Sequence, residues 1–98
     1  MATVGIAFGD PVMGGTIDFS QPASAQVIVT TASNAQSTAA ATRTGQVVVI
    51  SVSGSSVYAS IGPAPNALTD PGRRVLVGGS VTALGAVQAG NLVALADV

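Results

Sequence analysis

Residues 46–62, which read QVVVISVSGSSVYASIG, decide the fold of this chain. β-Branched residues crowd both halves of the stretch, and a polar, glycine-containing segment, residues 53–56, separates them. This pattern predicts two strands joined as an antiparallel hairpin. Alternate residues of the first strand share one face: Val48, Ile50 and Val52. Because Val47 and Val49 make the start of the other face apolar as well, we expect a central strand that is covered on both sides.

Further short strands are predicted on both sides of this hairpin, separated by turns rich in Gly, Pro, Asn and Asp. Alternating or β-branched segments indicate strands at residues 4–8, 16–19, 25–31, 73–77, 81–87 and 92–98. Seven to eight short strands without a substantial helix are typical of an all-β domain, an antiparallel β-sandwich or jelly roll. With 98 residues, the chain is expected to form a single domain over residues 1–98.

The segment 33–45, SNAQSTAAATRTG, allows two interpretations. Ser33 and Gln36 have the spacing of a capping box before three alanines, which would start a short helix. However, the segment has no apolar stripe for such a helix to bury, and short isolated helices are marginal. We therefore favour an extended arm, and we expect residues 1–10 and 33–45 to contact other subunits.

Charged residues are unusually scarce in this sequence. They make up 7% of the chain, against about 25% in typical domains, while alanine and valine supply most of the 48% hydrophobic residues. Such a chain could expose a neutral surface of Ser, Thr, Gln and Asn. Because a soluble monomer usually needs a charged surface without apolar patches, we favour the other interpretation, in which copies of the chain or another protein cover much of the surface.

The residue inventory argues against several classes of function. Histidine, cysteine, lysine, glutamate and tryptophan are absent, so general acid–base work would depend on four aspartates and one tyrosine, and an enzyme is not expected. Zinc and calcium would lack their usual ligand patterns, and no cofactor motif is present. The formal charge of −1 argues against nucleic-acid binding. Neither a signal peptide nor an apolar run of about 20 residues is present, so no membrane contact is expected.

Arginines, a tyrosine and turn residues are the candidate interface residues: Arg43, Tyr58, Pro63, Pro65, Asp70, Arg73 and Arg74. Tyr58 falls on the opposite strand face from Val57 and Ala59. It could be a partly buried aromatic residue or an interface anchor, because tyrosine and arginine are enriched at binding hot spots. The Arg73–Arg74 pair could contact Asp70 on the surface or a carboxylate of a partner chain.

Four segments resemble a layout found in small virion proteins of tailed bacteriophages: QSTA at 36–39, RxGxVxV at 43–49, VYASIGPAP at 57–65 and GNLVA at 90–94. The resemblance covers roughly residues 36–95. It departs from that layout at residues 78–80, GGS, where similar chains tend to carry a longer, charged turn.

Those proteins are β-sandwich or jelly-roll modules, and several are head decoration or cement proteins, often trimers. The resemblance implies a structural virion protein on the outer surface of the head, made in the cytoplasm of a host bacterium. Its expected partners are the major capsid protein and further copies of itself, in a homotrimer that bridges capsomers. The alternative is a tail or fibre module that binds a glycan or protein of the host surface.

Overall fold

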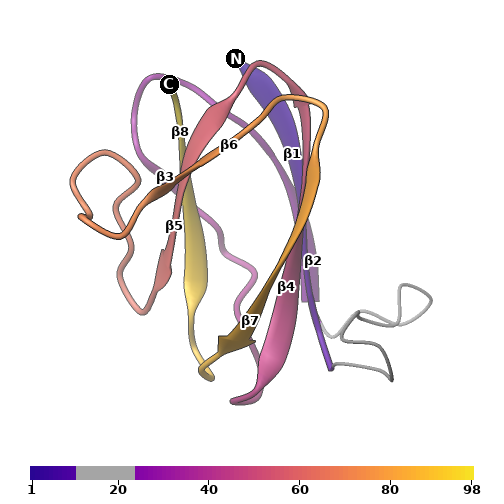
Figure 1. Cartoon of the computed structure of the whole chain (residues 1–98). Coiled ribbons are helices and arrows are strands. Elements are labelled where there is room, and N and C mark those ends of the chain that lie inside the picture. The colour runs from indigo at the N-terminus through magenta and orange to yellow at the C-terminus, as the bar shows by residue number, and fades with distance from the viewer. Residues whose placement is uncertain (11–23) are drawn as a thin grey trace.

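A computed structural model describes residues 1–10 and 24–98 of the chain (Figure 1). The described part is all-β: it contains eight strands in two four-stranded sheets and no helix. This confirms the predicted β-sandwich class. The strand expected at residues 16–19 lies outside the described residues.

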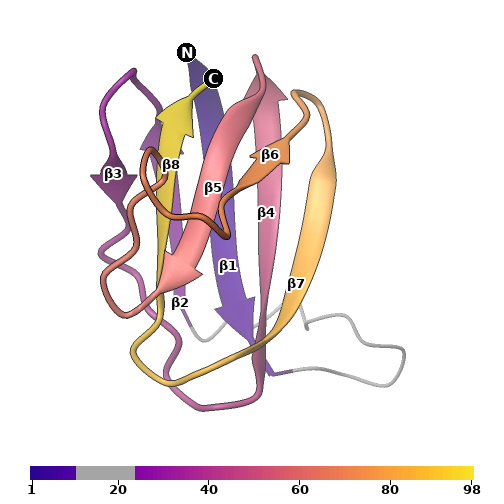
Figure 2. The ribbon, with the colours of Figure 1, turned by 60° about the vertical axis from the view of Figure 1, so that its left-hand side comes forward.

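The two sheets are antiparallel throughout. The order of the first sheet is β2 (Ser24–Val29), β1 (Ala2–Gly9), β4 (Gln46–Gly54) and β7 (Val81–Val87). The order of the second sheet is β3 (Ala35–Gln36), β8 (Leu92–Asp97), β5 (Val57–Gly62) and β6 (Arg74–Leu76). Figures 1 and 2 show the sheets as two facing layers, with both chain ends at the same end of the sandwich.

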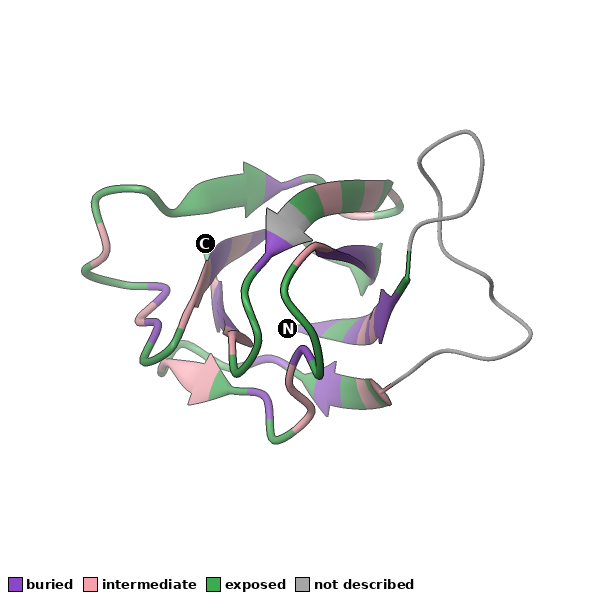
Figure 3. Ribbon diagram, turned by 90° about the horizontal axis from the view of Figure 1, so that it is seen from below, coloured by how far each residue is buried: buried purple, intermediate pink, exposed green. Residues whose placement is uncertain are grey.

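The core lies between the sheets, and alternate residues of each strand supply it, as the period-2 pattern predicts. β1 contributes Ile6 and Phe8, which meet Val93 and Leu95 of β8 in one buried cluster. The view along the sandwich shows buried segments on the inner sides of the two layers (Figure 3). Because β1 and β4 are the inner strands of their sheet, both carry long runs of apolar residues.

The predicted hairpin at residues 46–62 is wrong in one respect: β4 and β5 are strands, but they belong to different sheets. β4 pairs with β1 from Ala2↔Gly54 to Gly9↔Val47, and β5 pairs with β8 along its whole length. Gly54, with a φ of 107°, turns the chain out of one sheet and into the other. Both strands thereby direct their β-branched faces into the same core.

Both segments expected to contact other subunits are built into the sandwich. Residues 1–10 contain β1, which lies between β2 and β4. Residues 33–45 contain β3 and then follow β8: Ser37 N donates to Val93 O at 2.7 Å, and Ala41 N donates to Asn91 O at 3.0 Å. Since this segment satisfies its backbone groups along β8 and buries Ala41, it needs neither a helical stripe nor another subunit.

Candidate functional site

The outward face of the β2-β1-β4-β7 sheet, called here the open face, carries no charged side chain on the described strands. The strand registers place the following residues on it: Thr3, Gly5, Ala7, Ala25, Val27, Val29, Val47, Val49, Ser51, Ser53, Val81 and Ala83. Val27 and Val29 on β2 are 68% and 56% exposed, and Val81 on β7 is 68% exposed. Between these margins, Val47 and Val49 pack with Ala7 in a small apolar cluster. The open face therefore carries no charged side chain from one edge strand to the other, with exposed valines on both edge strands and Thr3, Ser51 and Ser53 between them.

A shallow hollow of about 380 Å³ crosses the β2 side of the open face. Its walls include Ala25, Val27, Val49 and Ser51, and Gly5 lies among them. A Cβ atom at Gly5 would meet only Ser51, at 3.9 Å, so the missing side chain leaves room rather than relieving a clash. The hollow can therefore receive an apolar side chain of a partner.

The outward face of the second sheet is covered by the chain itself. Residues 63–73, called here the cap loop, run across β5 and β8 (Figure 2). Ala67 is fully buried against Ala94, Ala96 and the half-buried Tyr58. The cap loop thus covers the small apolar residues of β5 and β8 on this face, while Val75 on β6 remains 55% exposed.

Polar anchors hold the cap loop in place. Asp70 Oδ2 accepts hydrogen bonds from Ser60 Oγ at 2.6 Å and from Asn66 N at 2.9 Å. On the other side of the loop, Asn34 Oδ1 accepts from Ala67 N at 2.7 Å, and Gln36 Nε2 donates to Pro65 O at 2.8 Å. The cap loop is thereby tied both to β5 and to the segment around β3.

The carboxyl group of Asp70 has a pKa below its ordinary value of 3.8. The hydrogen bond from Ser60 contributes most to this shift, followed by the one from Asn66 N, and the charge of Arg73 adds to it, while burial opposes it. Ser60 and Asp70 have no histidine or lysine beside them, because the chain contains neither. A hydroxyl that donates to a carboxylate without a further base is suited to holding a loop rather than to activating a nucleophile.

Most of the candidate interface residues gather at the cap loop. The Arg73 guanidinium lies 5.1 Å from the centre of the Tyr58 ring, and its Nη1 donates to Asp70 O at 3.1 Å. Pro65 is buried, whereas Pro63 is exposed. In the described residues, neither Arg73 nor Arg74 forms an ion pair with the Asp70 carboxylate. Tyr58 is half-buried beside Ala67, and Arg73 lies over its ring.

Arg43 lies apart from the other candidates, at the turn that leads into β4. Its guanidinium forms an exposed ion pair with Asp10. The Arg43 backbone N–H donates to the buried Gln46 side chain, whose Oε1 also accepts from Thr42 N at 2.8 Å. Arg43 is thus tied to its own turn through its backbone and to Asp10, just after β1, through its side chain.

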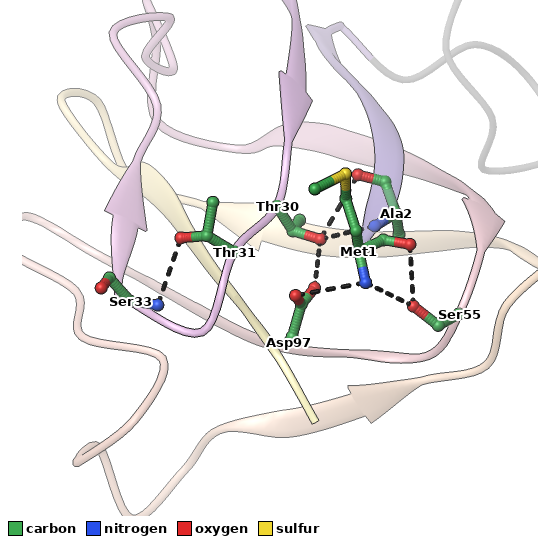
Figure 4. A network of polar contacts seen from close by, with 7 residues as sticks. All are labelled: Met1, Ala2, Thr30, Thr31, Ser33, Ser55 and Asp97. Carbon is green, nitrogen blue, oxygen red and sulfur yellow. Dashed lines mark hydrogen bonds and ion pairs between the residues drawn. The ribbon is translucent and has the colours of Figure 1, made fainter.

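A polar network joins the ends of β1, β2 and β8 (Figure 4). The Met1 ammonium lies 3.2 Å from Asp97 Oδ2 and donates to Ser55 Oγ at 3.1 Å. Thr30 Oγ1 donates to Asp97 Oδ1 at 2.5 Å and accepts from Ala2 N at 2.8 Å. The hydrogen bond from Thr30 is the main reason that the pKa of Asp97 is lowered. The network fixes the first residues of β1 against the second sheet.

Within residues 1–10 and 24–98, no group of three or more His, Cys, Asp or Glu side chains is placed to hold a metal ion. In the same residues, no helix has the length and apolar character needed to cross a membrane. The arrangement offers surfaces for contact with other molecules: an open apolar face and, beside the cap loop, a cleft described below.

Sequence reasoning missed the open face, although its signal is present in the outward positions of β1, β2 and β4. These positions hold only Thr, Gly, Ala, Val and Ser, with no charged residue among them. These positions can be recognised as one surface only when the strand order is known.

No protein-family model, curated protein or solved structure matches this chain.

Proposed function

We propose that this chain is a structural virion protein, a decoration or cement module that binds the outer surface of a bacteriophage head through its open face. The observation that carries this proposal is a sheet face with exposed valines and no charged side chain on its described strands, in a chain that covers β5 and β8 of its other sheet. The resemblance of residues 36–95 to small phage virion proteins supplies the phage assignment.

The dimensions of the open face support this role. Four strands about 4.8 Å apart, with residues rising about 3.3 Å each, give a face of roughly 500 Å². This is comparable to the largest apolar patches of soluble monomers, which are often functional. It is also somewhat smaller than the roughly 800 Å² per partner of a standard interface. One open face therefore supports modest affinity, which suits a protein that binds a shell in many copies.

Electrostatics would oppose such an association very little. Three arginines and four aspartates are the only charged side chains of the sequence. Arg43 is paired with Asp10, and Asp97 is paired with the Met1 ammonium. Because no charged side chain lies on the described strands of the open face, seating it on a protein surface desolvates no ion of those strands.

In this proposal, a homotrimer presents several open faces to the major capsid protein and bridges neighbouring capsomers. Burial of the open faces across the seams between capsomers contributes free energy that resists outward pressure on the shell. Since residues 1–10 contain an inner strand, they act through the outward side chains of β1, such as Thr3 and Ala7, and not as a free clamp.

The test compares two valine variants in their binding to purified heads that lack the chain. Val27→Asp puts a charge on the open face, while Val75→Asp puts one on β6, where the valine is similarly exposed, at 55% against 68%. We expect Val27→Asp to reduce occupancy at least tenfold and Val75→Asp to leave it nearly unchanged, measured by co-sedimentation. Equal binding of both variants would remove the open face from the mechanism.

Electron microscopy of virions that carry the chain tests the location. Hundreds of copies on the head are expected for a cement protein. A handful of copies at the tail, with a positive glycan array, would support the tail or fibre alternative instead. A chain that stays a well-folded monomer at high concentration and binds no protein shell would contradict the structural role altogether.

A further inference from the structure

A cleft opens on the side of the sandwich where β6 is too short to cover β5. β5 has six residues and β6 has three, and β6 pairs only with Val57, Tyr58 and Ala59. On the β6 side, the last three residues of β5, 60–62, therefore have no neighbouring strand. The cleft has a volume of about 510 Å³ and lies between this part of β5 and the C-terminal half of β7.

The lining of the cleft combines an apolar floor with a few polar groups. Ile61, Leu84 and Val87 supply apolar surface from the two sheets. The polar groups around this apolar floor come from Asp70, Arg74 and Asn91. This combination is typical of a site that binds an amphipathic molecule in one orientation.

Arg74 is placed unusually for a charged residue. It pairs with Ala59, whose side chain belongs to the core, so Arg74 lies on the core-facing side of β6. Leu76, the next residue on that side, is buried, whereas Arg74 is exposed at the cleft. Asp97, the other charged residue on an inner face, is bonded to Met1 and Thr30. Among the described residues, the Arg74 side chain has neither an ion pair nor a hydrogen bond.

Asp70, the carboxylate that lines the cleft, forms no ion pair with Arg74. Asp70 Oδ2 already accepts hydrogen bonds from Ser60 and Asn66. A guanidinium group binds a carboxylate through two parallel hydrogen bonds. Arg74 is therefore suited to an acidic group that enters the cleft from another molecule.

Backbone groups of β5 also face the cleft. Ser37 N donates to Val93 O, so Val93 directs its backbone groups toward the β3 side of β8. Because backbone directions alternate along an antiparallel ladder, Ala94 directs its groups to Ser60 on β5. By the same alternation, Ile61 directs its N–H and C=O away from β8, to the side where β6 has ended. An extended peptide supplies the donor and the acceptor that such an edge requires.

We propose that this cleft binds an extended peptide segment of a partner protein, which adds to the free edge of β5 at Ile61. One apolar side chain of the peptide packs against Leu84 and Val87, and a carboxylate two residues further along, on the same face of the extended peptide, binds Arg74. The site does not depend on the capsid assignment, because the open face and the cleft are different surfaces.

The probe is the capped peptide acetyl-Val-Leu-Asp-amide, titrated into the ¹⁵N-labelled full chain and followed by NMR. We expect saturable shifts of the Ile61 amide and of Arg74 Nε, with a dissociation constant in the millimolar range, since few groups are buried. The Asp-to-Asn peptide should bind about fivefold more weakly, because it loses a charge-assisted pair. The Arg74→Gln variant should lose the same factor, and its matched control, Arg73→Gln, should not.

Two further probes separate a peptide site from an anion site. The same peptide with N-methylated Leu and Asp backbone nitrogens should fail to shift the Ile61 amide, because it lacks the donors that pair with β5. Isovalerate carries a carboxylate and a branched apolar body but no peptide backbone. The proposal is overturned if isovalerate shifts the NMR signals of Ile61 and Arg74 as strongly as the peptide does. It is also overturned if the peptide causes no shift at a concentration of about 10 mM.

Discussion

The two outward faces of this sandwich are built from the same kinds of residue but meet different surroundings. The second sheet buries Ala94 and Ala96 beneath Ala67 of the cap loop. The first sheet leaves Val27 and Val81 mostly exposed on the open face. Small apolar side chains on a strand therefore do not by themselves indicate which face is internal. The difference comes from a connection with enough length and polar anchors to fold back over one sheet.

The anchors of the cap loop show what covering a face requires. Asp70, Asn34 and Gln36 each use a side chain to satisfy a backbone or hydroxyl group of the loop or of the strand beneath it. Without such partners, the loop would bury polar backbone groups at a cost that its few small apolar side chains could not offset. The open face has no comparable set of anchors on the described strands, which leaves it available to another protein.

A charged side chain placed on each of the two outward faces should give the largest difference in the free energy of unfolding. Ala94→Asp would bury an unpaired carboxylate under the cap loop and should lower the free energy of unfolding by roughly 3 kcal/mol or more. Val27→Asp places the same group in solvent and should cost less than about 1 kcal/mol. Urea unfolding of the two variants measures both values. Ala94→Ser and Val27→Thr are the uncharged controls, and equal losses for the two aspartates would show that the faces are equally open.

Most strands of this fold could be predicted from the sequence, but the short strand β3 and the arrangement of the strands in two sheets could not. Alternation at Val4, Ile6 and Phe8 identifies β1 because a two-residue period reports a face that is buried locally. Whether Gly54 joins a hairpin or a crossing between sheets depends on the partners of β4 and β5, which lie far away in the sequence. The short, glycine-containing connection is compatible with both outcomes.

The candidate site was only partly predictable for the same reason. Asp70-Pro71-Gly72 correctly indicated a turn, and Tyr58 was correctly placed opposite the core-facing residues of β5. Alternation also implies that Arg73 and Arg74 leave the chain on opposite sides. Only the structure shows that Arg73 lies over Tyr58 while Arg74 lines the cleft. The open face and the cleft depend on strand order and strand length, which no local pattern reveals.

Acid should loosen the cap loop that covers the second sheet. The folded-state pKa of Asp70 is below its ordinary value of 3.8, so its stabilising effect is present above the unfolded pKa and is lost as the pH falls through the folded value. The Ala67 amide, which donates to Asn34 Oδ1, reports on the cap loop. We therefore expect its hydrogen exchange to become faster, relative to the intrinsic exchange rate, as the pH falls below about 3.8. Amides at the start of β1 should respond through Asp97 instead, because that carboxylate holds Thr30 and the Met1 ammonium and its pKa is lowered as well.

The variant Asp70→Asn separates the two carboxylates. It should remove the acid response of the Ala67 amide while leaving the response of β1 that depends on Asp97, whose pKa is also lowered. Asp97→Asn is the reciprocal control, because it affects the end of β1 and leaves the cap loop anchored. An unchanged acid response of the Ala67 amide in Asp70→Asn would assign the loosening to another group.

The smallest expected effect concerns the contact of Arg73 with Tyr58. A cation over an aromatic ring at an exposed site contributes about 0.5–1 kcal/mol, so Arg73→Ala should lower the free energy of unfolding by no more than about that amount. A double-mutant cycle with Tyr58→Leu measures the coupling itself, because Tyr58 also packs against Ala67. Arg74→Ala, at the neighbouring position, should show no coupling to Tyr58. If Arg73→Ala and Tyr58→Leu are strictly additive, the hydrogen bonds of Asp70, Asn34 and Gln36 hold the cap loop without help from the arginine, and Arg73 remains free to contact a partner.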